Sequence, residues 1–276
     1  MQPGPSLPSE NASVPSTSSL TVGVLALQGA FVEHIALLQR AAATLAQKNH
    51  ALLAGTSLNF IEVRTPAELA SCAALILPGG ESTAISLIAE RCGLLQPLRD
   101  FVKLQRKPVW GTCAGLILLA ESANKSKATG QELIGGLDVR VQRNYFGRQV
   151  ESFEAGLNLR FLEGQALFHS VFIRAPVVER VLNEGVEAVE GGERVVVAPA
   201  LKATKAKVEI LGRLPGRAKS IRDQTTTAED LGEDGDIVAV KQGNVFGTAF
   251  HPELTGDERI HAWWLEEVVK AANGEA

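Results

Sequence analysis

The chain has 276 residues, of which 45% are hydrophobic and 21% are charged, proportions that are ordinary for a globular protein. Its 27 basic and 31 acidic side chains give a net charge of −4, so the chain lacks the basic excess that is typical of a nucleic-acid binder. No apolar run approaches the roughly 18 residues that a membrane-spanning helix needs. We therefore expect a folded protein with no nucleic-acid partner and no membrane partner.

The cysteines and the N-terminal composition indicate a cytoplasmic protein. Cys72, Cys92 and Cys113 lie far apart and form no C-x-x-C pair, so we expect neither a disulfide framework nor a metal site. Such cysteine usage fits a reducing compartment. Residues 1–19 are rich in Ser and Pro and contain no Lys or Arg, whereas a secretory signal needs a positive segment. We expect a disordered tail there.

In the first half of the chain, short apolar runs alternate with segments of helical periodicity. The apolar runs predict strands over residues 21–27, 58–63, 73–77 and 108–111. The periodic segments predict helices over residues 32–45, 66–69, 82–91, 95–105 and 114–120. In the first of these helices the recurring apolar residues are Val32, Ile35, Leu38, Ala42 and Leu45. Strands that alternate with helices favour a parallel sheet that is covered on both faces.

The second half of the chain is richer in β-structure. Short β-like runs occupy residues 137–141, 171–173, 186–189, 195–197, 237–240 and 245–250. An amphipathic pattern over residues 257–272 predicts a closing helix. The predicted fold class is α/β: a three-layer, mostly parallel open sheet with helices on both faces, plus a β-rich C-terminal half. We expect residues 20–276 to form a single domain.

A polar stretch at about residues 199–236 interrupts this order. Residues 202–222 hold seven basic side chains and one acidic, whereas residues 223–236 hold six acidic side chains and no basic one. The two blocks can neutralise each other, which favours a solvated surface insertion over a patch that binds RNA or a membrane. Residues 48–57 resemble a smaller insertion between a helix and a strand.

The strongest local signal for chemistry is the string G-T-C-A-G at residues 111–115, which follows a predicted strand and opens a predicted helix. The pattern is the thiol counterpart of the G-x-S-x-G nucleophile elbow. Its small residues permit a sharp turn, and a helix N-terminus favours the thiolate of Cys113. A small buried cysteine in a glycine-rich turn is the structural alternative. Cys72 and Cys92 lack such flanks and are expected in the core.

A thiol nucleophile needs a base, and His251 is the candidate. In an extended segment, residues i and i+2 point the same way, so Glu253 can orient and stabilise the imidazole of His251. The remaining histidines are interpreted as surface or structural residues: His34, His50, His169 and His261.

A third string, P-G-G-E-S-T at residues 78–83, also lies between a predicted strand and a predicted helix. Glycines there let the backbone approach a ligand and present N–H groups. A phosphate cradle is disfavoured because the P-loop Lys is missing and an acid follows. We expect an oxyanion hole, with one amide from Gly80 and one from Ala114.

Together these strings resemble a class I, triad-type glutamine amidotransferase. Longer strings narrow the resemblance to the glutaminase subunits of pyridoxal 5′-phosphate synthases: residues 25–30, 77–83, 111–116, 143–149, 172–176 and 250–255. The likeness spans about residues 21–272, and the strings at 143–149 and 172–176 are the most specific to that family. Residues 1–19, 48–57 and 199–236 depart from the family pattern without touching these strings.

The resemblance implies hydrolysis of L-glutamine to L-glutamate and ammonia without a cofactor, through a γ-glutamyl thioester on Cys113. His251 would transfer protons and Glu253 would orient it. The glutamine-binding positions carried over from the family are Gly79, Gly80, Glu81, Arg143, Ile173 and Arg174. An arginine can hold the substrate carboxylate by paired hydrogen bonds, and an acid can hold the ammonium. Gln28 ends the first strand at the same sheet edge and is expected near the site or the partner interface.

The resemblance also implies a partner, because the family delivers ammonia to a separate synthase subunit, a (β/α)8 barrel that this chain is too short to include. Two other classes stay open. One is a different cysteine hydrolase on a similar fold, such as a γ-glutamyl hydrolase or a protease-like enzyme, against which the string at 143–149 argues. The other is a non-catalytic regulatory protein, against which the three filled triad positions argue.

Overall fold

A computed structural model describes most of the chain. The described residues are 18–49, 51–124, 131–143, 145, 152–162, 164, 166–182, 195–200, 204–214 and 235–274. Residues 1–17 of the predicted tail and the predicted strand at 186–189 lie outside this part. Residues 18 and 19, which the sequence assigns to the tail, already belong to the first strand.

The centre of the molecule is one open sheet, whose parallel core has the strand order β2-β1-β3-β4-β13. These strands are β1 (Ser18–Leu25), β2 (Thr56–Val63), β3 (Ala74–Leu77), β4 (Val109–Thr112) and β13 (Val245–Thr248). The sheet continues beyond β13 through β12 (Asp236–Gln242), β9 (Val177–Val181), β6 (Leu137–Gln142), β5 (Ala120–Asn124) and β10 (Val195–Val197), and β11 (Glu209–Leu214) pairs with β12. Two further strands, β7 (Ser152–Leu157) and β8 (Phe168–Ile173), form a separate antiparallel pair.

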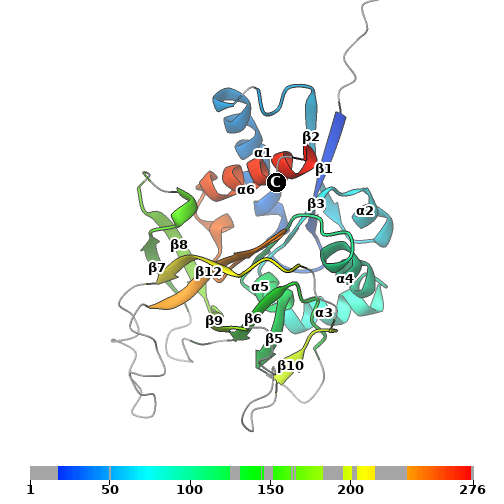
Figure 1. Ribbon diagram of the computed structural model, residues 1–276, viewed down its shortest axis with the longest axis vertical. Helices are drawn as coiled ribbons and strands as arrows, with labels where there is room; N and C mark the ends of the chain where they lie inside the picture. The colour runs from blue at the N-terminus through cyan, green and yellow to red at the C-terminus, as the bar shows by residue number, and fades with distance from the viewer. Residues whose placement is uncertain are drawn as a thin grey trace, which may run out of the picture.

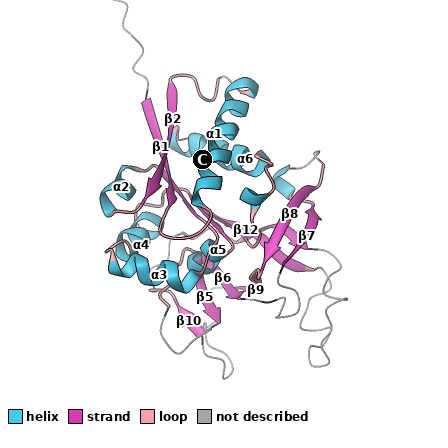
Figure 2. Ribbon diagram, turned by 180° about the vertical axis from the view of Figure 1, so that it is seen from behind, coloured by secondary structure: helices cyan, strands magenta, loops and turns pink. Residues whose placement is uncertain are grey.

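Helices cover both faces of the sheet (Figures 1 and 2). On one face α1 (Phe31–Lys48) packs against α6 (Arg259–Ala272). On the other face lie α2 (Pro66–Ser71), α3 (Ser82–Arg91), α4 (Leu95–Lys103) and α5 (Ala114–Leu119). Two 3-10 turns, η1 (Arg160–Leu162) and η2 (Pro252–Leu254), precede β8 and α6. The three-layer α/β fold expected from the sequence is thereby confirmed.

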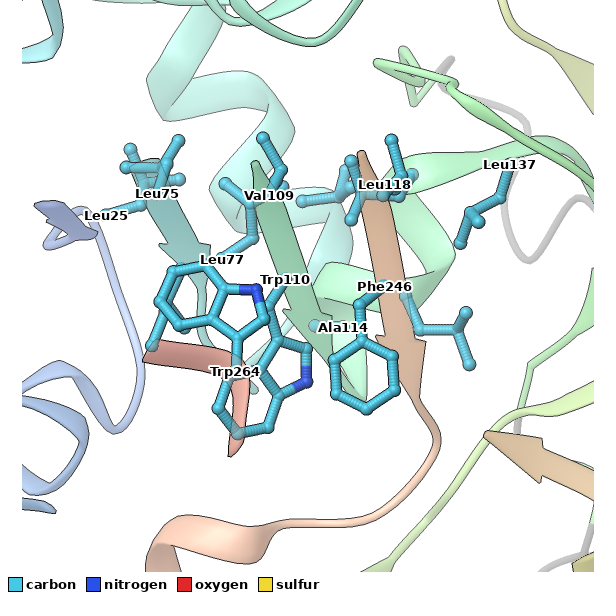
Figure 3. Close-up of a cluster of buried hydrophobic side chains, with 14 of the residues drawn as sticks. Leu25, Leu75, Leu77, Val109, Trp110, Ala114, Leu118, Leu137, Phe246 and Trp264 are labelled. Atoms are coloured by element: carbon cyan, nitrogen blue, oxygen red, sulfur yellow. The ribbon is translucent and has the colours of Figure 1, made fainter. Parts of the chain in front are cut away.

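The strands alternate their side chains between the two helical layers, as strand geometry requires. Figure 3 shows the indoles of Trp110 and Trp264 gathered with Phe246 on one side of β4 and β13, whereas Val109 and Leu118 lie on the other side. The Trp110 ring lies 5.4 Å from that of Phe246 and 5.8 Å from that of Trp264. Its buried Nε1–H donates to Thr248 Oγ1 at 3.2 Å, so the indole is packed and hydrogen-bonded at once.

The buried face of α1 differs from the apolar stripe that the sequence suggests. Val32 is 57% exposed, so its expected place in the core is wrong. The buried residues of the helix are His34, Leu37, Leu38, Ala41 and Leu45. Compared with the predicted apolar stripe, the buried face is turned about the helix axis, because it includes His34, which a pattern of hydrophobic residues omits.

The polar stretch at 199–236 contains a strand of the central sheet, which the sequence analysis did not predict. Residues 209–214 form β11, which pairs with β12, and Leu211 and Leu214 are buried. This strand lies within the basic block at 202–222, and the charged residues of the block dominate the local composition, so the sequence pattern does not reveal the strand. Residues 201–203 and 215–234 of the stretch lie outside the described part of the chain.

Three more strands were not predicted from the sequence: β5, β7 and β9. The letters of β5, A-E-S-A-N, carry little β-propensity. The strand forms because β6 and β10 hydrogen-bond to its two edges. Tertiary pairing thus overrides local preference at this end of the sheet.

Gly115 allows α5 to lie directly on β3, and we predict that Gly115→Ala destabilises the fold. The added methyl group would overlap the backbone carbonyl oxygen of Leu77, which cannot move aside as a side chain can. Overpacking of this kind costs about 1–3 kcal/mol or more of unfolding free energy, measurable by urea denaturation. In the control Gly156→Ala, the methyl group would meet only the exposed side chain of Leu167, at 3.1 Å. Equal losses in the two variants would contradict the prediction.

Candidate active site

Cys113 sits at the turn between β4 and α5, as the elbow pattern predicts. Its backbone has φ 47° and ψ −99°, a left-handed conformation that is uncommon for a residue other than glycine. Its amide donates to Thr248 O at 2.8 Å, which ties the turn to β13. The residue is 6% exposed. A strained backbone held by its neighbours at a strand end is typical of a functional position.

His251 follows β13 and contacts Glu253, as the sequence predicts. The His251 Nδ1 and Glu253 Oε1 atoms are 2.8 Å apart, and both side chains are buried. The segment is not extended, because Glu253 lies in η2 and Pro252 starts that turn. The His251 amide donates to Val171 O at 2.8 Å, so β8 holds the histidine backbone.

The charges of this pair stabilise each other. Burial alone would lower the pKa of His251, but hydrogen bonds and charge interactions with Cys113 and Glu253 outweigh burial and raise it to about 10. Burial alone would raise the pKa of Glu253, yet the surrounding histidines, chiefly His34 and then His251, hold it below its ordinary value. The Cys113 sulfur therefore lies within hydrogen-bonding and electrostatic reach of the His251 imidazole, and the negative groups around that ring favour its charged form.

The glycine loop between β3 and α3 lies against the histidine. A methyl group on Gly79 would overlap the His251 ring, so only a glycine fits there. Glu81 is the N-cap of α3, and its carboxylate accepts from Thr83 N at 3.0 Å and Ala84 N at 2.7 Å. The loop thus brings Gly80 close to His251, and its C-terminal end is held by the capped N-terminus of α3.

Gln28 also reaches this loop. Its Oε1 accepts from Glu81 N at 2.7 Å, and a methyl group on Gly80 would overlap the same oxygen. The next residue, Gly29, has φ 104°, and a methyl group there would overlap Gly79 O. The loop after β1 and the loop after β3 are therefore packed backbone to backbone, and Gln28 lies where the sequence expects it, at the edge of the site.

Arg143 is buried, and Gln131 joins it by hydrogen bonds to the first turn of α3. The sequence analysis missed Gln131. The Oε1 atom of Gln131 accepts from Ser82 Oγ and Thr83 Oγ1, at 3.3 Å each, and from Arg143 Nη1. Burial lowers the pKa of Arg143 to about 10, while the charge of Glu81 acts in the opposite direction. The guanidinium is still charged at neutral pH. Gln131 follows no recognisable string, so no local signal could have identified it.

Ile173 and Arg174 complete the surroundings of the thiol from the end of β8. The Ile173 carbonyl oxygen is 4.0 Å from Cys113 Sγ, and the side chain is 38% exposed. Arg174 has φ 42°, a second left-handed residue at this edge. The structure thus brings Cys113, His251 and Ile173 together. Arg174 follows Ile173 directly, and its side chain is exposed.

Two further histidines lie behind Glu253. His34 Nε2 is 3.4 Å from Glu253 Oε2, and His34 Nδ1 is 2.9 Å from His261 Nε2. Both rings are fully buried and hydrogen-bonded, so of the two alternatives that the sequence left open, surface or structural, they take the structural one. A signal was present in the sequence: His34 precedes Leu38 and Leu45 by 4 and 11 residues, which places it on the same helical face.

Two negative findings apply to the described part of the chain. There, no group of three or more His, Cys, Asp or Glu side chains is arranged to hold a metal ion. No helix in that part combines the length and the apolar character needed to cross a bilayer.

Known proteins resemble this chain along most of its length. A model of the SNO glutamine amidotransferase family matches residues 24–212 and 211–270. The chain is 40% identical to the probable pyridoxal 5′-phosphate synthase subunit PDX2 of Arabidopsis thaliana, over 92% of this chain and 88% of that protein. It is 38% identical to the pyridoxal 5′-phosphate synthase subunit SNO1 of Saccharomyces cerevisiae, over 91% and 94% respectively. A solved structure described as a glutamine amidotransferase shares 37% identity at a TM-score of 0.61, covering 90% of this chain and 98% of that one.

The buried histidine pair predicts a loss of stability in mild acid. Burial holds the pKa of both His34 and His261 at about 3, against an ordinary 6.5. Between these values the unfolded chain binds protons that the folded chain does not, so the free energy of unfolding falls as pH decreases. Between pH 7.5 and pH 5.5 each of these two histidines contributes a loss of about 1.4 kcal/mol, and the raised pKa of His251 offsets about one of them. The expected net loss is therefore about 1.4 kcal/mol, measurable by urea denaturation.

Variants test the source of this slope. His261→Phe keeps a ring against Trp110 and removes one titrating group, so we expect a shallower dependence of unfolding free energy on pH. The control His169→Gln removes a histidine whose side chain is 58% exposed, and should leave the slope unchanged. A slope that responds to both variants alike would contradict the assignment.

Proposed function

Because the chain belongs to the SNO glutamine amidotransferase family, we propose that it hydrolyses L-glutamine to L-glutamate and ammonia as the glutaminase subunit of a pyridoxal 5′-phosphate synthase. The observation that carries this proposal is the position of Cys113 on a strained turn within reach of the His251–Glu253 pair. These three residues are what a thiol-dependent amide hydrolase needs: a nucleophile, a proton carrier and an orienting carboxylate.

The proposed reaction has two halves. The Cys113 thiolate attacks the side-chain carboxamide carbon of glutamine, a C–S bond forms, and the C–N bond then breaks. His251 protonates the departing nitrogen, which leaves as ammonia. In the second half His251 takes a proton from water, whose oxygen attacks the thioester carbon, and the C–S bond breaks to release glutamate. Glu253 holds the ring by its Nδ1–H and balances its charge throughout.

The negative oxygen of each tetrahedral intermediate needs donors, and we assign the Gly80 and Ala114 amides to it. Ala114 is the first residue of α5, where backbone N–H groups have no partner within the helix. Gly80 lies on the loop whose neighbour Gly79 touches the His251 ring. Removing one such donor in other hydrolases costs about 10²–10³ in kcat.

The ends of glutamine are charged, and the site offers matching groups. We assign the substrate carboxylate to Arg143, whose buried guanidinium is fixed by Gln131. We assign the ammonium to the region of Glu81, with Gly79 and the exposed pair Ile173–Arg174 completing the pocket. Two observations support this assignment. Arg143 and Glu81 carry opposite charges, and both are tied to the first turn of α3, Glu81 directly and Arg143 through Gln131.

The proposed partner is the synthase subunit that consumes the ammonia, which we expect to be a (β/α)8 barrel. The matched relatives are themselves named as subunits of a pyridoxal 5′-phosphate synthase. We propose that Gln28 relays contact with this partner, because it touches the backbone of the glycine loop from the loop after β1. The family assignment favours this function over a γ-glutamyl hydrolase or protease-like activity on the same fold.

Cys113 should be the nucleophile that a glutamine-analogue electrophile labels. We expect a diazo-ketone analogue of glutamine to modify Cys113 and to spare Cys72 and Cys92, as read by peptide mass spectrometry. Cys113→Ala should abolish hydrolysis while urea denaturation shows a folded protein. Burial raises the pKa of Cys72 to about 11, so that thiol serves as an internal unreactive control. Labelling chiefly at another cysteine would refute the proposed function.

We predict that the isolated chain is a poor glutaminase and that the synthase subunit activates it. Neither glycine has a side chain that opposes rotation, so the Gly79-Gly80 peptide can present either a carbonyl or an N–H to the oxyanion once the contact between Gly79 O and Ala30 N, at 3.4 Å, is broken. Fixing the N–H would raise kcat by up to about 10²–10³. The measurement is kcat for glutamine with and without saturating synthase subunit. Full activity of the isolated chain would contradict this gate.

A matched pair of variants tests the role of Gln28 in this activation. Gln28→Ala removes the acceptor for Glu81 N and should reduce the activation by the partner. Gln96→Ala alters an exposed glutamine on α4, which pairs with Asp100, and should leave activation unchanged. Equal activation in the two variants would remove Gln28 from the relay.

A further inference from the structure

The carboxylate of Glu253 is enclosed from two sides by histidines. Its Oε1 faces His251, and its Oε2 lies 3.4 Å from His34 Nε2. Oε2 is buried and has no partner of strict hydrogen-bond geometry in the described part of the molecule, so His34 is the group placed to serve it. Both side chains have no exposed surface. A charged oxygen in such a place is costly unless a donor faces it.

The hydrogen positions in this cluster follow from the carboxylate. An ionised carboxylate only accepts, so the atoms that face it must carry hydrogen. His34 must therefore bear its proton on Nε2, and Thr112 Oγ1 at 3.3 Å shares that side of the ring. The opposite nitrogen, Nδ1, is then a lone-pair acceptor. Its neighbour His261 Nε2, at 2.9 Å, must be the donor.

The result is a one-way row of hydrogen bonds from His261 to His34 to Glu253. The reverse tautomer of His34 would point a nitrogen lone pair at the carboxylate oxygen, which is repulsive in a buried site. Protonation of His34 on both nitrogens is also disfavoured. Burial opposes it most, and the charge of His251 opposes it as well, whereas Glu253 favours it. His34 also lies in the first turn of α1, where the positive end of the helix dipole disfavours a second positive charge on the ring.

We propose that His34, held in one tautomer by His261, is a positioning residue for the hydrolytic reaction and fixes the Glu253 carboxylate from behind. This inference rests on the proposed function for its kinetic consequences, but the hydrogen positions do not. His34 touches neither thiol nor substrate. It acts through Glu253, which must present Oε1 to His251 while the ring transfers protons twice in each turnover.

The proposal predicts a specific kinetic defect. Without a donor at Oε2, the carboxylate is free to turn toward other donors, and His251 loses its fixed orientation. Substrate contacts at Arg143 and the glycine loop are untouched, so KM should stay within about twofold. We expect His34→Leu to lower kcat by about 10- to 100-fold, by analogy with the hydrogen-bond partners that orient metal ligands in metalloenzymes.

The experiment compares two replacements of similar size. His34→Gln offers an amide N–H at about the reach of Nε2 and should restore most of kcat, whereas His34→Leu offers no donor. Both are measured with saturating synthase subunit. His261→Leu removes only the donor to Nδ1 and should give a smaller loss in the same direction. Equal kcat for His34→Leu and His34→Gln would overturn the proposal.

A double-mutant cycle separates positioning from packing. In a Glu253→Gln background the charge that His34 serves is absent, so His34→Leu should have little further effect on kcat. A loss of the same factor in both backgrounds would show that His34 acts by packing alone, and would overturn the proposal. Urea denaturation of every variant accompanies the kinetics.

A direct observation of the protons needs no active variant. In ¹⁵N-histidine-labelled wild-type protein, NMR should show a neutral ring protonated on Nε2, and this signal should be lost in His34→Gln. A second neutral Nε2–H ring should be assigned to His261 in the same way. A His34 ring protonated on Nδ1 would overturn the proposal, even if His34→Leu fails to fold. If the wild type with its partner does not hydrolyse glutamine, the proposed function fails. The position of the proton on the His34 ring still tests whether His34 is held in the tautomer that donates to Glu253.

Discussion

One buried negative charge, on Glu253, organises much of this molecule. A carboxylate without access to water must be met by donors, and here they come from separate elements. His251 approaches from the end of β13 and His34 from the first turn of α1. His261, in the first turn of α6, supports His34 in turn. The carboxylate thus connects the sheet edge to the helical layer, and the same contacts that hold the layers together orient the imidazole nearest the thiol.

A second constraint is the close approach of loops at the carboxyl ends of β1 and β3. Gly29, Gly79 and Gly80 each lack room for a methyl group, because another backbone, the His251 ring or the Gln28 side chain occupies it. Glycines here are required by contact rather than by flexibility alone. The consequence is a continuous path of touching atoms from the outer loop after β1 to the imidazole. A partner that moves Gln28 therefore reaches the proposed oxyanion donors without any large rearrangement.

Sequence reasoning predicted the parallel core, the turn at Cys113 and the contact between His251 and Glu253, because each depends on local signals. The strain at Cys113 follows from its small neighbours, and α3 was predicted with the bounds that it has. It missed β5 and β11, whose letters are polar or lie among charge blocks, because sheet partners rather than propensity form them. It also missed Gln131, since a single glutamine that joins Arg143 to α3 leaves no periodic trace.

The histidines show why residue type alone could not assign roles. His251 has its pKa raised to about 10, whereas His34, only a carboxylate away, has its pKa lowered to about 3. Both rings are buried, and both face Glu253. The difference is that His251 also faces the thiol, a second group that favours its charge, while His34 faces another histidine and a hydroxyl. One carboxylate can neutralise one imidazolium, so the second ring must stay neutral and serve as a donor. In the proposed mechanism the two rings therefore have different roles: the charged ring transfers protons, and the neutral ring holds in place the carboxylate that stabilises this charge.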